Sequence, residues 1–286
     1  MIELFQNIFI QEDLDIFVKP YKIVPISDSA GLVEFLEGAH SIDRIKKSGA
    51  ASGSSSSSSS SSSFSPSPFI NSNSNGNGNG NSNGNSNGNG NGNSNSNANG
   101  NSNFTPTLRR FFEHQFGEAY TFTHAHAVDN FVKSLVGYSL LTYCLQVKDR
   151  HNANILLDSD GHIIHIDYGF ILGDSPGMNI NFENAPFKLT KEYVEVLGGL
   201  DSEAMKTFQR LFIKGFFALQ KHVEAIATIV KLFYGEKRKN AADDVRSRLL
   251  FARTESDVYA LIRDSLDNWR TKQYDWFQQR TNDILP

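Results

Sequence analysis

A long low-complexity tract at residues 49–103 limits what this chain can fold into more than any other feature of its sequence. The tract is poly-Ser, then a Ser-Pro segment, then alternating Asn-Gly and Asn-Ser, and no charged residue lies between Lys47 and Arg109. Such a composition cannot bury enough apolar surface to offset the entropy lost on ordering, so we expect disorder. Any folded core must be built from the two flanking parts.

The tract is interpreted as an inert insertion in a surface loop, spanning residues 49–107. The entropic cost of closing a loop grows only logarithmically with its length, so both flanks can belong to one fold. The whole chain has 286 residues, 39% of them hydrophobic and 22 of them Phe, which favours one sizeable packed core.

Charge and cysteine content exclude several classes of protein. The net charge of −4 leaves no basic footprint, so no nucleic-acid partner is expected. Cys144 is the single cysteine and lies in an apolar run, which rules out a disulfide within the chain and favours a reducing cytoplasmic compartment. We see no signal peptide and no membrane-spanning run, so membrane contact would be peripheral.

Hydrophobic periodicity predicts an α+β fold. Before the tract, residues 2–10 have helical spacing, residues 20–27 read as a strand and residues 31–42 as a second extended segment. After the tract, residues 108–147 are expected to form two helices, the second from about residue 125. Its apolar stripe comprises Phe131, Leu135, Tyr138 and Thr142.

A hairpin and a helical lobe complete the prediction. Residues 154–157 and 162–166 read as strands joined by a turn at residues 158–161. From Asp201 onward the chain is expected to be helical, with Asp201 as one cap and Thr254 starting a capping box. The last core stripe comprises Val258, Leu261, Ile262 and Leu266.

The hairpin also raises metal alternatives, which the spacing disfavours. If residues 158–161 belonged to a calcium loop, the first ligand would be Leu156, which cannot coordinate. His162 and His165 are an odd number of residues apart, so a strand places them on opposite faces. His165 and Asp167 share a face, but two ligands without cysteine make a weak zinc site.

The pattern that remains is Asp149-x-x-x-x-Asn154, followed by the two strands and then Asp167-Tyr168-Gly169. Phosphoryl transfer needs one carboxylate near the attacking hydroxyl, and an Asn and a second Asp that hold magnesium against ATP phosphates. Positioning and charge neutralisation dominate such catalysis, and oxygen ligands suit magnesium. The pattern therefore indicates a kinase centre.

These motifs resemble a known family. The run D-R-H-x-x-N followed by H-I-D-Y-G is similar to the catalytic and activation loops of phosphatidylinositol 3- and 4-kinases and their large protein-kinase relatives. Residues 20–42, 186–201 and 271–285 look most like type III phosphatidylinositol 4-kinases, the beta form in particular. The resemblance implies a protein-kinase-like lipid kinase fold, with a partial small lobe and an α-rich large lobe.

By that resemblance, Asp149 would polarise or deprotonate the inositol hydroxyl, with His151 a second candidate for handling a proton or phosphate. Asn154 and Asp167 would bind Mg²⁺, and Arg150 would brace the loop. The resemblance further implies that the backbone of three hinge residues contacts the adenine of ATP and that three apolar side chains line the adenine pocket. The hinge residues are Glu34, Phe35 and Leu36, and the walls are Val33, Leu156 and Ile166.

The activation segment at residues 170–187 contains no Lys or Arg but includes Asp174 and Glu183. A loop that selects phosphorylated headgroups should offer cations, so unphosphorylated phosphatidylinositol in membranes is the expected substrate. The resemblance alone implies that the 4-hydroxyl of inositol is the group phosphorylated. It also implies a peripheral location on intracellular membranes, such as the Golgi, and regulatory protein partners. An aromatic and basic C-terminal cluster suits a membrane interface: Trp269, Arg270, Lys272, Tyr274, Trp276, Phe277 and Arg280.

The resemblance predicts three parts: residues 1–48 as a partial small lobe and hinge, 49–107 as the insertion and 108–286 as the large lobe. It also places the start of the chain within the small lobe, since no Gly-rich phosphate loop or strand lysine precedes the first helix. Two functions stay open: an active phosphatidylinositol 4-kinase catalytic region, and a truncated or pseudokinase module that binds membrane or partners. A large protein kinase is disfavoured by residues 187–190 and the short length.

Overall fold

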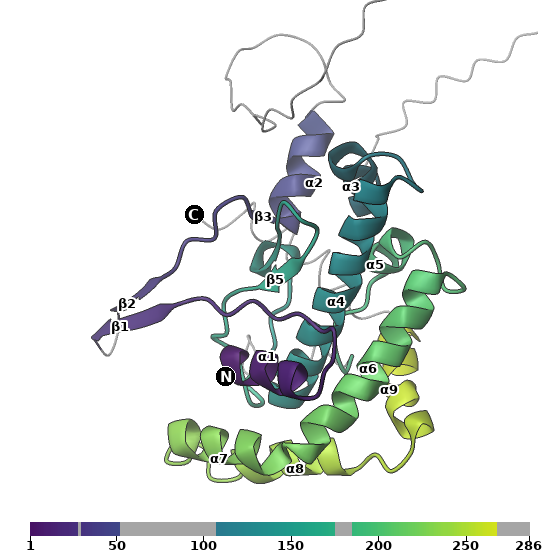
Figure 1. Ribbon diagram of the computed structural model, residues 1–286. Helices are drawn as coiled ribbons and strands as arrows, with labels where there is room; N and C mark the ends of the chain where they lie inside the picture. Colours follow the sequence, from purple (N-terminus) through teal and green to yellow (C-terminus); the bar gives the residue numbers. More distant parts are fainter. Residues whose placement is uncertain (28–29, 52–106, 175–184, 268–286) are drawn as a thin grey trace, which may run out of the picture.

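The computed structural model describes residues 1–27, 30–51, 107–174 and 185–267 (Figure 1). The elements in chain order are α1 (Ile2–Gln11), β1 (Ile23–Ser27), β2 (Ala30–Val33), β3 (His40–Ser41), α2 (Ile42–Ala51), α3 (Leu108–Phe116), α4 (Phe122–Leu145), the 3-10 helix η1 (Asn152–Asn154), β4 (Ile155–Leu157), β5 (Ile163–His165), α5 (Lys191–Val196), α6 (Glu203–Lys221), α7 (Val223–Tyr234), α8 (Ala241–Leu250) and α9 (Glu255–Asp267). The predicted α+β class is confirmed.

Two small antiparallel sheets lie among these helices. β1 and β2 form a hairpin that extends away from the body of the molecule (Figure 1), and β3, β4 and β5 form a second sheet in that order. The predicted strand at residues 20–27 and the predicted hairpin at residues 154–166 are confirmed. The extended segment expected at residues 31–42 is only partly strand, because Ile42 already begins α2.

Helix α4 is the centre of the fold. All four residues of its predicted stripe are buried, and α6 packs along it (Figure 1). The helix begins earlier than predicted, at Phe122, because the Thr121 hydroxyl accepts a hydrogen bond from the backbone N–H of His124. It ends at Gln146, which adopts the left-handed conformation common at helix C-termini. Cys144 lies buried in the core, and burial raises the pKa of its thiol to about 12.

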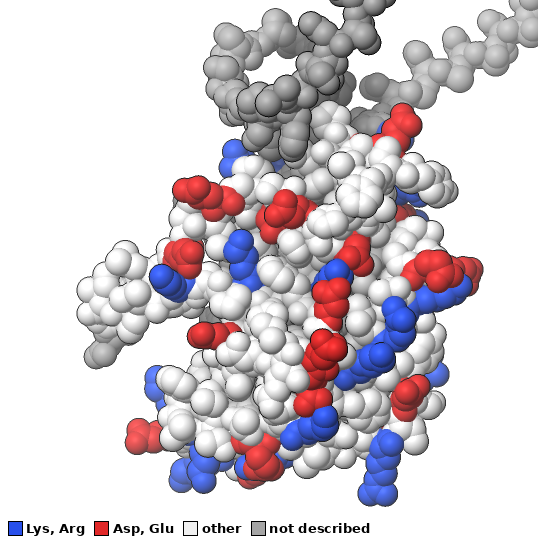
Figure 2. Space-filling model, in the orientation of Figure 1, with Lys and Arg blue, Asp and Glu red and all other residues white. Residues whose placement is uncertain are grey.

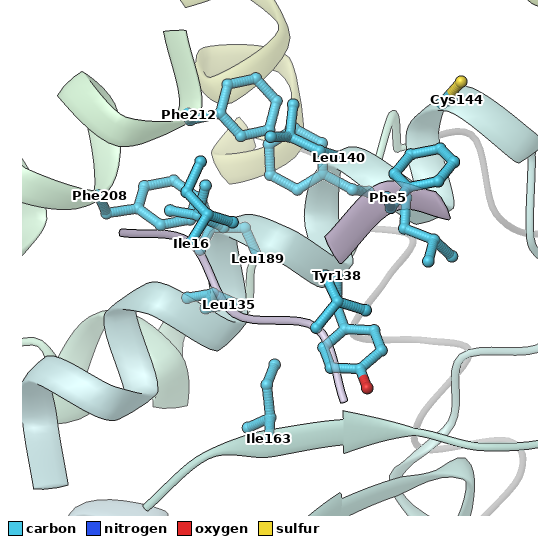
Figure 3. Close-up of a cluster of buried hydrophobic side chains, with 14 of the residues drawn as sticks. Phe5, Ile16, Leu135, Tyr138, Leu140, Cys144, Ile163, Leu189, Phe208 and Phe212 are labelled. Carbon is cyan, nitrogen blue, oxygen red and sulfur yellow. The ribbon is translucent and has the colours of Figure 1, made fainter. Parts of the chain in front are cut away.

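The segment after α1 crosses α4 at a glycine. Phe5 of α1 and Ile16 lie in the same apolar cluster as residues of α4 and α6 (Figure 3). A Cβ at Gly137 would lie 2.4 Å from the carbonyl oxygen of Phe17 and 2.6 Å from Val18 Cγ2. The missing side chain at Gly137 therefore lets the N-terminal segment run directly over the helix. Residues 1–18 share one hydrophobic core with the helices that follow the insertion.

Of the two helix N-caps predicted in the C-terminal part, one is confirmed and one is not. At α9, Thr254 and Asp257 form the expected capping box: Asp257 N donates to Thr254 Oγ1 at 3.3 Å, and Thr254 N donates to Asp257 Oδ2 at 2.8 Å. The expectation for Asp201 was wrong. Ser202 caps α6, since its hydroxyl accepts from Met205 N at 3.1 Å. The final core stripe is buried or partly buried, as predicted.

Three sequence-based expectations fall outside this description. The insertion lies outside the described residues apart from its edges, where α2 ends at Ala51 and Thr107 caps α3. The aromatic C-terminal cluster and most of the central activation segment also lie outside them. Among the described helices, none combines the length and apolarity that crossing a membrane requires.

Replacing Gly137 with Ala should lower the free energy of unfolding by about 1–3 kcal/mol, because the new methyl group meets backbone. This loss should appear although Ala favours a helix over Gly by about 1 kcal/mol. Gly215→Ala on α6 is the matched control, since its Cβ would meet only side-chain ends, Leu140 Cδ1 and Ile16 Cδ1. Urea unfolding of both variants checks this; a Gly137→Ala chain as stable as Gly215→Ala would contradict it.

Candidate active site

The two motif loops face each other across the base of the β4–β5 hairpin. Backbone hydrogen bonds join them at both ends: Lys148 N donates to Phe170 O at 2.8 Å, and Ile166 N donates to Asn154 O at 3.0 Å. Asp149 and Asp167 lie between these two bonds, on opposite loops. The hairpin thus places the two predicted acidic residues on neighbouring loops.

The buried guanidinium of Arg150 holds the loops together from within. Its Nε–H donates to the carbonyl of Lys148 at 3.0 Å, on its own loop. Its Nη1 donates to the carbonyl of Ile166 at 2.7 Å, and its Nη2 donates to the carbonyl of Asp167, both on the opposite loop. The predicted bracing role of Arg150 is confirmed: one planar cation satisfies three carbonyls that the strands leave unpaired.

Both motif aspartates adopt left-handed backbone conformations, with φ 63° at Asp149 and 58° at Asp167. Non-glycine residues seldom occupy this region, and Asp and Asn tolerate it best. The Asp167 carboxylate supports its own turn, since Oδ1 accepts from Gly169 N at 3.1 Å. Such local strain, held by the surrounding hydrogen bonds, concentrates at functional sites.

Asn154 and Asp167 offer the oxygens that magnesium prefers. Asn154 Nδ2 donates to the carbonyl of Asp149 at 3.0 Å, which orients the amide, and no donor among the described residues reaches its Oδ1. Asp167 is exposed, and its Oδ2 is likewise not engaged by any described donor. One oriented amide oxygen and one accessible carboxylate oxygen fit a magnesium site completed by phosphate and water.

His151 lies beside Asp149, with Nε2 and the carboxylate Oδ2 3.8 Å apart. The other ring nitrogen, Nδ1, accepts a hydrogen bond from Ala153 N at 3.2 Å and so caps the 3-10 helix η1. That contact fixes the ring plane. The structure therefore brings the two predicted catalytic side chains together.

Lys188 is a site residue that sequence reasoning missed. It follows the activation segment and is buried, and its Nζ donates to the carbonyl of Arg150 at 2.8 Å and to Asn152 Oδ1 at 3.1 Å. Lys188 thereby fastens the catalytic loop to the segment before α5. A lysine between Phe187 and Leu189 in an otherwise apolar stretch was the available signal.

A layer of aromatic rings supports the loops from below. His165 stacks on Tyr138 of α4, with centroids 4.7 Å apart, and burial beside Arg150 holds the pKa of His165 well below its usual range. The imidazole is therefore neutral. The hydroxyl of Tyr168 donates to the carbonyl of His165 at 3.2 Å. Burial raises the pKa of Tyr21, near Asp167, to about 12.

The predicted adenine residues separate into two groups. Val33 and Phe35 are 62% and 83% exposed, so the described structure does not enclose them. The backbone of Glu34 pairs with Lys22 instead, its N–H donating to the Lys22 carbonyl at 2.8 Å. Leu36 is half-buried against the core.

Leu156 and Ile166 form the second group. Leu156 pairs with Ile164 across the hairpin, and Ile166 is two residues beyond Ile164, so both side chains share one face of the sheet. Both are half-buried. On its other side Leu156 pairs with Ser41 of β3, the strand into which the hinge residues lead. Leu156 and Ile166 thus lie on one face of the hairpin, whereas Val33 and Phe35 are largely exposed.

The acidic turn of the hairpin collects Asp158, Asp160 and His162, whose potential ligand atoms lie within 4.8 Å of one another. The oxygens of Asp158 are already used: Oδ1 accepts from the backbone N–H of Asp160 at 3.0 Å and of His162 at 2.8 Å. Oδ2 lies 3.1 Å from His162 Nδ1, and this contact lowers the pKa of Asp158. These contacts explain the turn itself, so we assign it a structural role.

Replacing Lys188 with Met should destabilise the protein by about 1–3 kcal/mol, because two buried acceptors lose their donor while the side-chain volume is kept. Lys191→Met, at an exposed lysine in the next helix, is the matched control and should change stability by less than about 0.5 kcal/mol. Thermal unfolding followed by circular dichroism gives both values. Equal melting curves for the two variants would show that Lys188 does not fasten the loop.

Comparison with known proteins agrees with this geometry. Residues 1–238 match the family model described as phosphatidylinositol 3- and 4-kinase. The chain is 48% identical to phosphatidylinositol 4-kinase beta 1 of Arabidopsis thaliana over 172 residues, covering 54% of this chain and 15% of the relative. It is 32% identical to the Homo sapiens phosphatidylinositol 4-kinase beta over 298 aligned positions, covering 100% of this chain and 29% of the relative.

The chain thus spans less than a third of the length of these curated relatives. The fold is the protein-kinase-like fold of lipid kinases, as predicted. With the family model covering most of the chain and the two motif loops braced as described, the chain belongs to the phosphatidylinositol 3- and 4-kinase family.

Proposed function

We propose that the chain is the catalytic region of a phosphatidylinositol 4-kinase, which transfers the γ-phosphate of ATP to the inositol 4-hydroxyl of phosphatidylinositol. The observation that carries the proposal is the Arg150 brace, which presents Asp149 and Asp167 on two facing loops. The relatives' names supply the lipid and the ring position. Family membership implies the use of ATP and a divalent metal.

Each motif residue has a role that follows from its surroundings. Asp149 would accept the hydroxyl proton of the inositol ring, with His151 beside it to orient or share that proton. Asn154 Oδ1 and the Asp167 carboxylate would hold Mg²⁺. When bound, the metal supplies neutralisation of the phosphate charge that develops during transfer. Because Arg150 and Lys188 already satisfy the loop carbonyls, these side chains need little rearrangement to bind.

Leu156 and Ile166 are proposed to contact the adenine, since they share one face of the hairpin beside the motif loops. Leu36 is proposed to join them on the basis of the resemblance. Apolar side chains with nearby backbone amides and carbonyls are typical of purine sites. The roles assigned to Val33, Glu34 and Phe35 rest on the resemblance. We also propose that residues 1–48 form a partial small lobe with the hinge, that residues 49–107 are an insertion, and that residues 108–286 form the large lobe.

The activation segment favours an unphosphorylated inositol ring. The segment itself contains no Lys or Arg, and its described end is acidic at Asp174. Arg238 from the loop after α7 forms an ion pair with Asp174 and donates to the carbonyl of Leu172. That cation is therefore engaged by the protein and is not available for a headgroup phosphate. A membrane-bound substrate also implies peripheral contact with intracellular membranes. Regulation by protein partners is proposed from the resemblance alone.

Replacing Asp167 with Asn should lower lipid phosphorylation by about 100-fold or more, because a neutral amide binds magnesium poorly and cannot neutralise phosphate charge. Asp160→Asn, an exposed carboxylate in the same hairpin, is the matched control and should leave turnover unchanged. The measurement is transfer of labelled phosphate from ATP to phosphatidylinositol vesicles. Vesicles carrying phosphatidylinositol 4-phosphate should accept little label.

Equal product from the native chain and the Asp167→Asn variant would contradict catalysis. That result would favour the alternative, a module of the same family that binds membrane or partners without phosphoryl transfer. Preference for the phosphorylated lipid would contradict the argument from the activation segment.

A further inference from the structure

We propose that the segment from Lys231 to Lys239, here called the α7–α8 tip, is a contact site for anionic phospholipid bilayers beside the active site. The inference rests on the proposed function, which requires the enzyme to meet a lipid in its membrane. The tip comprises the last turn of α7 and the loop that leads to α8. It lies at one extremity of the molecule, where α7 and α8 run side by side (Figure 1).

The apolar part of the tip is unusually exposed for its helix. α7 reads VEAIATIVKLFY, and its inner face is buried through Val223, Ile226, Ala227 and Val230. On the outer face Leu232 is 75% exposed and Phe233 is 74% exposed. A helix that is apolar on nearly all sides is normally buried on all sides, so the outer face of α7 lacks a covering partner within the described residues.

Basic residues outnumber acidic ones in the tip. Between residues 231 and 239 the sequence holds four basic residues, Lys231, Lys237, Arg238 and Lys239, against one acidic residue, Glu236. The three lysines are exposed and form no ion pair with another described residue. Figure 2 shows a white surface over α7 with charged groups along its margin. Exposed Leu and Phe beside lysines suit the boundary between the headgroups and the acyl chains of an anionic bilayer.

The acidic residues that follow the tip, Asp243 and Asp244 at the start of α8, are exposed. Asp243 at the start of α8 pairs with Arg246 at 2.8 Å, and Arg246 also binds Glu224 of α7. One arginine thus serves two carboxylates, and Asp244 has no ion pair with another described residue. Within the tip itself three exposed lysines stand against Glu236, so the charge carried beside Leu232 and Phe233 is positive, which favours an anionic surface over a neutral one.

Arg238 connects the tip to the chemistry. Its guanidinium binds both the carbonyl of Leu172 and the carboxylate of Asp174, which come five and seven residues after Asp167. Leu172 N in turn donates to the carbonyl of Leu145 at 2.8 Å, at the end of α4. A bilayer held at the tip would thus meet the start of the activation segment, the part that must approach the lipid headgroup.

The test is co-sedimentation of the 286-residue chain with phosphatidylcholine vesicles, with and without phosphatidylserine. The double variant Lys237→Gln with Lys239→Gln should weaken binding to the anionic vesicles about 30-fold, at roughly fivefold per lysine. The double variant Leu232→Ser with Phe233→Ser should weaken it about tenfold or more. Added salt should weaken native binding, as expected for surface charges.

Two control variants match these in chemistry and exposure. Arg210→Gln with Lys214→Gln removes two exposed charges of α6 that form no ion pair with another described residue, and Ile10→Ser with Leu200→Ser removes two exposed apolar side chains elsewhere. Both controls should bind as the native chain does. If the tip variants also bind vesicles as the native chain does, the proposal is overturned, and a protein becomes the candidate partner for this surface. Equal losses of binding in the control variants would overturn it too.

A second readout separates this inference from the proposed function. The tip variants should phosphorylate a soluble short-chain phosphatidylinositol as fast as the native chain, and lose turnover only on vesicles. A native chain without turnover in either assay would count against the proposed function, while its vesicle binding would still decide the role of the tip. Loss of turnover on the soluble lipid, with vesicle binding intact, would contradict the tip as a bilayer contact.

Discussion

The arrangement of the active site depends on one buried guanidinium. Arg150 takes its three acceptors from the carbonyls of two different loops, and no other described side chain bridges these loops in this way. A lysine at this position could not reach all three with one planar group. Because Asp149 and Asp167 both sit in left-handed conformations that cost free energy, their loops need such a constraint to stay in place.

The brace works because the hairpin rests on a rigid base. His165 and Ile163 point into a core built on α4, and the neutral ring of His165 stacks on Tyr138. The N-terminal segment packs on the same helix at Gly137, where the missing side chain leaves room for the Phe17 carbonyl. Lys19 N then donates to the Tyr138 hydroxyl at 3.2 Å. Residues before the insertion and residues after it thus meet at one side chain beneath the site.

Much of this could be predicted from the sequence, where the signal is local. The spacing of Phe131, Leu135 and Tyr138 gave α4, and the turn composition gave the hairpin, because periodicity and turn chemistry act over a few residues. The Thr254 capping box was predictable for the same reason. Ser202 displaced Asp201 as a cap because either side chain can cap a helix and only the path of the chain decides between them.

The long-range contacts had no local signal. Lys188 contacts the carbonyl of Arg150, which lies 38 residues away in the sequence; its apolar neighbours could have indicated that it is buried, but not which groups it contacts. The exposure of Val33 and Phe35 was also not predictable, since a strand pattern does not tell which face is covered. Likewise the ion pair of Arg238 with Asp174 joins the loop after α7 to the activation segment through the tertiary fold alone.

The most direct test of the brace is the magnesium-dependent affinity for a non-hydrolysable ATP analogue, measured by calorimetry on the native chain and on Arg150→Lys. If Arg150 positions the magnesium ligands, the variant should remain folded by circular dichroism while its affinity falls about tenfold or more, as for other groups that orient metal ligands. A folded Arg150→Lys chain with the native affinity would contradict the account.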